Sequence, residues 1–134
     1  MRRSLSAALI ALAAALLLAV PAGAITTAHF SVRAIGTSQH RTHNGYRFTE
    51  RLRRHGRVVG RDEVRCRQRG RRKTTCRAVF FFAAGKIKAK GEFGSGDNRL
   101  QVTGGTSRYD GVAGKVLIHD RGANNTRLEF VLVK

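Results

Sequence analysis

The fold is decided by residues 78–117, which read AVFFFAAGKIKAKGEFGSGDNRLQVTGGTSRYDGVAGKVL. An apolar run, 78–84, is followed by an alternating segment, 86–93, and by a glycine-rich turn, 103–111. Strand-like segments that are joined by glycine turns, with no helical period between them, are typical of antiparallel β-structure. The sequence therefore predicts an all-β protein.

Outward from this stretch, the same pattern predicts eight short strands. They are residues 28–35, 46–52, 58–67, 74–84, 86–93, 100–102, 112–119 and 126–133. The segment 36–45 between the first two has the composition of a polar loop. Because no helix is predicted to cover a sheet face, closure into a small barrel is the economical way to remove exposed edges. We therefore expect an eight-stranded antiparallel β-barrel.

Alternation along these strands predicts which side chains face the interior. Residues 86–93 place lysines outward and Ile87 and Ala89 inward, and the preceding strand places Phe80 and Phe82 on one face and Phe81 on the other. A strand that is apolar on both faces is buried on both. The outer face around Phe81 should then be covered by a loop or by another subunit, which favours an oligomer.

The first 24 residues have the pattern of a secretory signal peptide. The basic pair Arg2-Arg3 precedes an apolar run, 5–20, and Ala22-Gly23-Ala24 forms a small-residue cleavage pattern. The alternative is a membrane anchor, but the run is shorter than the roughly 20 residues that a spanning helix needs. We expect a secreted, extracellular protein with one domain, 25–134, and no membrane attachment after cleavage.

The charge is strongly positive and uneven. The chain of 134 residues has a formal net charge of +18, which falls to +16 when Arg2 and Arg3 leave with the signal peptide. Alternation predicts one exterior cationic patch made of Arg57, Arg61, Arg65, Arg67 and Arg77, the last lying across a hairpin from Arg65. Such a patch attracts nucleic acid or another polyanion in a salt-dependent way. The alternative is a solvated exterior, since no aromatic residues are interleaved as stacking platforms.

Cys66 and Cys76 lie on either side of the basic turn 68–73. A hairpin centred on Arg71 places them directly opposite each other, within reach of a disulfide. An oxidising compartment favours that bond. The alternative of two metal-ligating thiolates lacks further ligands nearby.

The five histidines show no metal-ligand spacing on a predicted element, and we expect them to be solvated. They are His29, His40, His43, His55 and His119, of which His40 and His43 fall in the predicted loop 36–45. The sequence therefore predicts no metal and no other cofactor.

Three motifs of the second half match one known pattern. The pattern runs G-x-C, then an apolar-aromatic strand with G-x-I/L-x-V-x-G, then L-x-I-T-G-G-T/A-G-x-[YF]-x-G-A-x-G-x-V. It is matched by Cys66 and by residues 80–91 and 100–116. By these motifs the chain resembles the allene oxide cyclase and dirigent superfamily, most of all the bacterial secreted allene-oxide-cyclase-like proteins. The resemblance implies an eight-stranded barrel, often a homotrimer, with Tyr109 as a structural anchor of the glycine turn.

The resemblance also bears on activity. The plant cyclases have a strand F-T-N-K-L, which Phe48-Thr49-Glu50-Arg51-Leu52 resembles, so Glu50 stands where they have asparagine. Their first-strand catalytic carboxylate has no counterpart, because no Asp or Glu lies between Ile25 and Thr49. If the protein is an enzyme, the resemblance implies an isomerase or cyclase.

Glu50 and Asp62 are the candidate catalytic acids. If the turn 54–56 has three residues, both face the barrel interior, together with Tyr46, Phe48 and Leu52 from one strand and Val58, Val64 and Cys66 from the next. Desolvation and mutual repulsion then raise the pKa of at least one carboxyl, which suits a general acid. If the turn has two residues, the register shifts by one and Asp62 faces solvent.

Two functions follow as hypotheses. In the first, the interior binds a small hydrophobic molecule against Tyr46, Phe48, Phe80 and Phe82, and acts as an isomerase, cyclase or stereo-directing protein by confinement. In the second, the arginine-rich exterior makes the chain an extracellular polyanion-binding protein.

Overall fold

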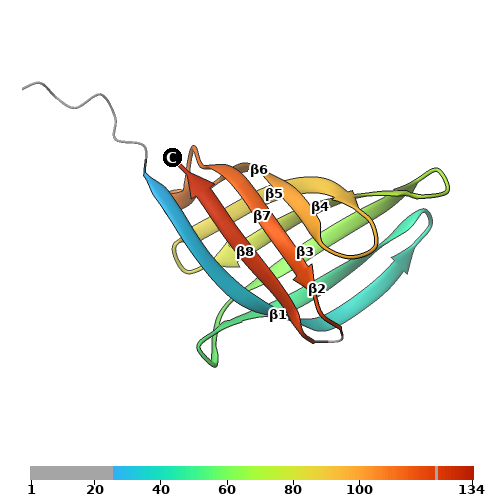
Figure 1. Ribbon diagram of the computed structural model, residues 1–134, viewed down its shortest axis with the longest axis horizontal. Coiled ribbons are helices and arrows are strands. Elements are labelled where there is room, and N and C mark those ends of the chain that lie inside the picture. Colours follow the sequence, from blue (N-terminus) through green and yellow to red (C-terminus); the bar gives the residue numbers. More distant parts are fainter. Residues whose placement is uncertain (1–25, 123) are drawn as a thin grey trace, which may run out of the picture.

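Antiparallel pairing connects each strand to the next along the chain, and the last strand pairs with the first to close a barrel (Figure 1). The computed structural model describes residues 26–122 and 124–134. The predicted signal peptide, 1–24, lies outside these residues. Within the described residues, no helix is long and apolar enough to cross a membrane. The predicted all-β, eight-stranded antiparallel barrel is confirmed.

The elements follow in simple order. They are β1 (Thr27–Thr42), β2 (Gly45–Arg54), β3 (Arg57–Arg69), β4 (Lys73–Phe82), β5 (Gly85–Phe93), β6 (Asn98–Gly105), the 3-10 helix η1 (Ser107–Tyr109), β7 (Ala113–Asp120) and β8 (Thr126–Val133). The fourth strand ends at Phe82 instead of Ala84, because Ala83 and Ala84 form the turn into β5.

The predicted loop 36–45 is wrong. Strand β1 continues to Thr42, and its pairing with β2 shifts register between Gly36 and Ser38. The Thr37 and Ser38 hydroxyls both lie within hydrogen-bond distance of Thr49 Oγ1, at 2.8 and 2.6 Å. Backbone pairing does not need apolar side chains, so this polar segment continues β1 along β2, beyond Ala34, the last β1 residue paired with β8. His40 is therefore a strand residue.

The β2–β3 connection combines a short turn with a bulge. Its turn has two residues, His55 and Gly56, both with positive φ, at 50° and 75°. Farther along, Leu52 pairs with Gly60 while Arg53 pairs with Val58, so β3 carries one extra residue at this point. With a two-residue turn alone, the residues of β3 after the turn would point to the opposite face of the sheet. The extra residue reverses this change, so that Asp62 pairs with Glu50. Asp62 consequently faces the interior, whereas Val58, predicted to face inward, is 54% exposed.

Aromatic rings fill the barrel at the end where the β2–β3 and β4–β5 turns lie. Phe130 stacks on Phe30 at 4.8 Å between ring centroids and meets Phe80 edge-on at 4.9 Å and Phe82 at 5.6 Å. Tyr109 lies 6.2 Å from Phe82. We refer to Phe30, Phe80, Phe82, Phe130 and Tyr109 as the aromatic plug.

The glycine turn holds η1 close to the sheet. A Cβ added to Gly105 would lie 2.5 Å from the carbonyl oxygen of Tyr109 and 2.6 Å from that of Lys86. Only glycine permits this approach. The turn motif thus holds Tyr109 against the Phe82 ring within the plug, which agrees with its predicted role as an anchor.

On the outer wall, Phe81 is covered by its own chain. Arg61 and Lys86, its cross-strand neighbours, place their cations 4.0 and 5.2 Å from the centroid of the Phe81 ring. Cation–π contacts of this kind shield an exposed aromatic face. The outward position of Phe81 does not by itself require a second subunit.

The predicted disulfide joins Cys66 and Cys76 across β3 and β4. The two residues are directly opposite in register, with Cα atoms 4.1 Å apart, and both are buried inside the barrel. The bond closes the hairpin whose turn is residues 70–72.

Removing this crosslink in the variant Cys66→Ala/Cys76→Ala should lower the free energy of unfolding by about 2–3 kcal/mol, because the unfolded chain gains loop entropy. Urea unfolding with and without reductant measures the effect. Reductant should destabilise the wild type and leave the variant unchanged; equal responses of both proteins would contradict the prediction.

Candidate functional site

A cavity of about 570 Å³ lies inside the barrel end opposite the aromatic plug. Its walls come from strands β2 to β8 and from the β3–β4 and β5–β6 turns. The lining residues are Tyr46, Phe48, Glu50, Gln68, Arg71, Arg72, Thr74, Phe93, Gly94, Ser95, Gly96, Asn98, Ile118, Asp120 and Thr126. We call it the mouth cavity. Its volume is in the range of small-molecule sites.

Strand β2 supplies one wall of the mouth cavity. Tyr46, Phe48 and Glu50 alternate with exposed or outward-facing residues, as a strand period of two requires. The rings of Tyr46 and Phe48 stack with centroids 6.1 Å apart. The same strand therefore presents an aromatic surface and a carboxyl group to the cavity.

Asp62 lies directly opposite Glu50 on β3, and its other cross-strand neighbour is Phe80 of the plug. Its side chain is fully buried, and neither carboxyl oxygen has a hydrogen-bond partner in the part of the chain that the structure describes. A buried polar group without a partner is costly, and a buried unpaired charge far more so. The position therefore favours the neutral, protonated acid.

The pKa values follow from this environment. Burial, together with the Coulombic repulsion from Glu50, raises the pKa of Asp62 to about 9. Burial is the largest cause that raises the pKa of Glu50; the facing Asp62 carboxyl offsets part of this shift, and the charge of Asp120 adds to it. Two facing carboxyls titrate as one system, so the Glu50–Asp62 pair retains at least one proton at neutral pH.

The arrangement suits proton donation into the mouth cavity, which has aromatic surface on one wall and polar side chains on the others. Glu50 lines the cavity, and Asp62 lies behind it as a proton-bearing acid. A general acid of this kind protonates an oxygen of a bound molecule when it lies within hydrogen-bond reach. No group of three or more His, Cys, Asp or Glu side chains that could hold a metal ion occurs among the residues described.

The predicted ligand-binding aromatics separate into two places. Tyr46 and Phe48 line the mouth cavity, but Phe80 and Phe82 do not, because both belong to the aromatic plug. Phe80 is only 1% exposed. The sequence analysis missed Phe93 and Asp120 as lining residues, although both occupy inward positions if the predicted alternation is continued to the strand ends.

The predicted cationic patch changes its membership. Arg65 and Arg77 are directly opposite, as expected, and the row continues to Arg47 on one side and Lys90 on the other. Arg61 and Arg67 are also exposed. Arg57 does not continue the row, because it pairs with Arg54 on the other side of the bulge, where the alternation of faces along β3 is shifted by one residue.

Two histidines take part in an ion-pair chain instead of being fully solvated. His119 contacts Glu129 at 3.0 Å and Asp97 at 3.2 Å, and His29 contacts the other oxygen of Glu129 at 2.6 Å. The β5–β6 turn brings Asp97 to His119, a contact between residues 22 positions apart that local patterns do not reveal. These contacts, with His119 the first cause for each, lower the pKa values of Asp97 and Glu129.

Comparison with solved structures finds the same fold in proteins of low sequence identity. No protein-family profile matches the chain, and no curated protein sequence matches it. Pyocyanin demethylase shares the fold with a TM-score of 0.69 and 17% identity, over 80% of this chain and all of that one. The exo-specific intermolecular Diels-Alderase AbnU has a TM-score of 0.63 and 15% sequence identity, and the match covers 84% of this chain and 100% of that one. The pterocarpan synthase dirigent protein GePTS1 has a TM-score of 0.59 and 10% sequence identity, and the match covers 82% of this chain and 86% of that one. The dirigent-like barrel that the sequence resembles is thus confirmed as the fold.

Asp62 should make stability depend on pH. The folded chain holds its proton up to about pH 9, whereas an unfolded chain releases it near 3.8. Folding therefore takes up a proton between these values, and stability falls as the pH rises through this window, by up to about 1.4 kcal/mol per pH unit.

Chemical unfolding at intervals from pH 5 to pH 9 measures this dependence. Asp62→Asn should flatten the curve and be more stable than the wild type at pH 8. Glu92→Gln, a change at an exposed carboxyl on β5 that does not influence Asp62, should keep the wild-type slope. Parallel curves for wild type and Asp62→Asn would exclude a raised pKa at this position.

Proposed function

We propose that the mouth cavity binds a small hydrophobic molecule that carries a proton-accepting oxygen, and that the barrel directs its ring closure or isomerisation. The observation that carries this proposal is the buried, unpartnered Asp62 carboxyl facing Glu50 behind an aromatic wall. A barrel that needed only stability would place an apolar side chain there.

Confinement supplies one part of the proposed mechanism. Tyr46, Phe48 and Phe93 contribute ring surfaces to a cavity whose floor is rigid, because the barrel beneath is filled by the aromatic plug. A reactive molecule held there in one conformer loses the rotational freedom that otherwise slows and randomises its reaction. This contribution requires no cofactor.

Proton donation supplies the other part. An oxygen of the bound molecule that approaches Glu50 accepts a proton from the Glu50–Asp62 pair, and the bond to that oxygen is polarised as negative charge develops on it. The acid comes from β2 and β3, so it replaces the first-strand carboxylate that the resembled cyclases use and this chain lacks.

The structural neighbours support a role of this class. One is named as a Diels-Alderase and one as a dirigent protein, and their barrels cover at least four fifths of this chain. We further propose that the protein works outside the cell as a homotrimer, in keeping with the predicted signal peptide and with a disulfide, which persists in oxidising compartments.

Native mass spectrometry with panels of unsaturated lipids and phenolics tests the binding step. The wild type should retain at least one species, and Phe48→Ala should weaken that binding roughly tenfold through lost apolar contact. Phe81→Ala, which removes an aromatic ring from the outer wall, is the matched control and should bind as the wild type does. Failure to retain any species, or equal losses in both variants, would contradict the proposal.

A second candidate function, binding of long polyanions such as nucleic acid, is favoured by one observation. Arg47, Arg65, Arg77 and Lys90 form a row in direct cross-strand register on the outer wall. None of the four forms a salt bridge within the described residues, and like charges in this arrangement repel. If the row acts as a unit, neutralisation of Arg47, Arg65 and Arg77 weakens heparin retention more than neutralisation of the same number of charges at Lys86, Lys88 and Lys115; equal losses would contradict a specific site.

A further inference from the structure

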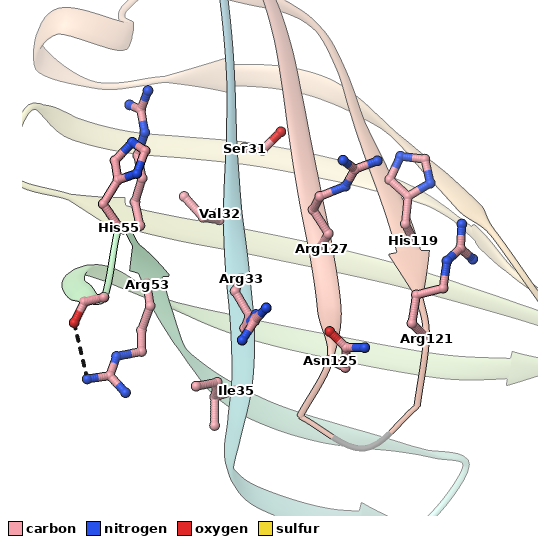
Figure 2. A pocket seen from close by; sticks show the side chains of 12 residues that line it. Ser31, Val32, Arg33, Ile35, Arg53, His55, His119, Arg121, Asn125 and Arg127 are labelled. Carbon is pink, nitrogen blue, oxygen red and sulfur yellow. Dashed lines mark hydrogen bonds between the residues drawn. The ribbon is translucent and has the colours of Figure 1, made fainter.

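The outer wall opposite the Arg47–Lys90 row carries a groove of about 940 Å³ (Figure 2). It crosses β1, with the β2–β3 turn on one side and the β7–β8 hairpin on the other. Five of its lining residues are arginines and two are histidines, namely Arg33, Arg53, Arg54, Arg121, Arg127, His55 and His119. None of the described residues that line it is acidic.

Cross-strand register aligns the central cations. Arg33 pairs with Arg53 on β2 and with Arg127 on β8, and Arg127 pairs with His119 on β7. Figure 2 shows the three arginines on neighbouring strands, with His55 on one side of the groove and Arg121 on the other. Neighbouring strands are about 4.8 Å apart, so three guanidinium groups are spread over roughly 10 Å.

Within the described residues none of these three arginines forms an ion pair, although Arg127 lies close enough to Glu129 to contribute to the lowered pKa of that carboxyl. Among the described residues, the only side-chain hydrogen bond of these three arginines joins Arg53 to the Gly56 carbonyl, at 3.4 Å. The nearby carboxylates of Asp97 and Glu129 are engaged by Arg121, His119 and His29. Directly opposed like charges destabilise a sheet, and a bound oxyanion would replace that repulsion with charge-assisted, bidentate hydrogen bonds.

We propose that this groove is a binding site for a ligand with two or three linked phosphoryl groups. A chain of such groups can bridge arginines on adjacent strands with their side chains spread out, whereas a single phosphate requires all three side chains to converge. The volume exceeds that of the phosphates alone, and Ile35 and Asn125 provide apolar and polar surface for an attached organic group. The site lies on the exterior and is separate from the mouth cavity.

Isothermal titration calorimetry with sodium tripolyphosphate tests the proposal. The titration is run at about 0.05 and about 0.15 M salt, because salt screens interactions between exposed charges. The wild type should bind, and Arg33→Gln/Arg127→Gln should bind roughly tenfold or more weakly, because two charged hydrogen-bond donors are lost. Lys86→Gln/Lys88→Gln is the matched control, since it removes the same charge from two exposed side chains of β5 that belong to neither cationic site. The control should lose less than about threefold.

Two further arms define the ligand. Orthophosphate should bind far more weakly than tripolyphosphate, and ATP shows whether a nucleoside adds affinity or the phosphate chain alone is recognised. Amide chemical shifts in the wild type should change most at Arg33, Arg53 and Arg127, which locates the site without any variant. Absence of tripolyphosphate binding, equal losses in the two double variants, or equal affinity for orthophosphate would overturn the proposal.

Discussion

The register between β2 and β3 is the constraint on which the candidate site depends. A two-residue turn at His55 and Gly56 would by itself turn Asp62 outward among arginines, and the extra residue at the bulge turns it inward again, opposite Glu50. The barrel thereby keeps a carboxyl in its interior with no hydrogen-bond partner among the described residues. Bulges of this kind often redirect a side chain at a functional site. The cost of burying Asp62 is the strongest physical indication that the position serves something other than stability.

The aromatic plug fills one end of the barrel interior and leaves the other end open. Phe30, Phe80, Phe82 and Phe130 occupy one end of the barrel, and the cavity lies at the other, bounded by smaller and more polar inward residues. Because Asp62 has Phe80 on one side and Glu50 on the other, it stands at the boundary between the filled and the open parts. In the Glu50–Asp62 pair, Asp62 is therefore desolvated by the plug, and Glu50 is reached from the cavity.

Much of this architecture could be predicted from the sequence, because strand alternation is a local signal. The inward faces of residues 86–93, the opposition of Cys66 and Cys76, and the eight strands all follow from a period of two and from turn residues. The polar continuation of β1 could not, since its strand is held by backbone pairing with β2 and not by apolar side chains. Nor could the bulge at Val58 and Val59, because two valines in a strand give no sign that one of them is unpaired. The contribution of Phe30 and Phe130 to the plug depends on closure between β1 and β8, which no local pattern specifies.

The central claim is that the barrel interior holds a protonated acid facing the mouth cavity. Titration of the Asp62 carboxyl carbon by ¹³C nuclear magnetic resonance, with Asp62→Asn used for assignment, tests it most directly. The account predicts a midpoint near pH 9, with a linked change at Glu50. A midpoint near the ordinary value of 3.8 would show that Asp62 is solvated and would contradict the account.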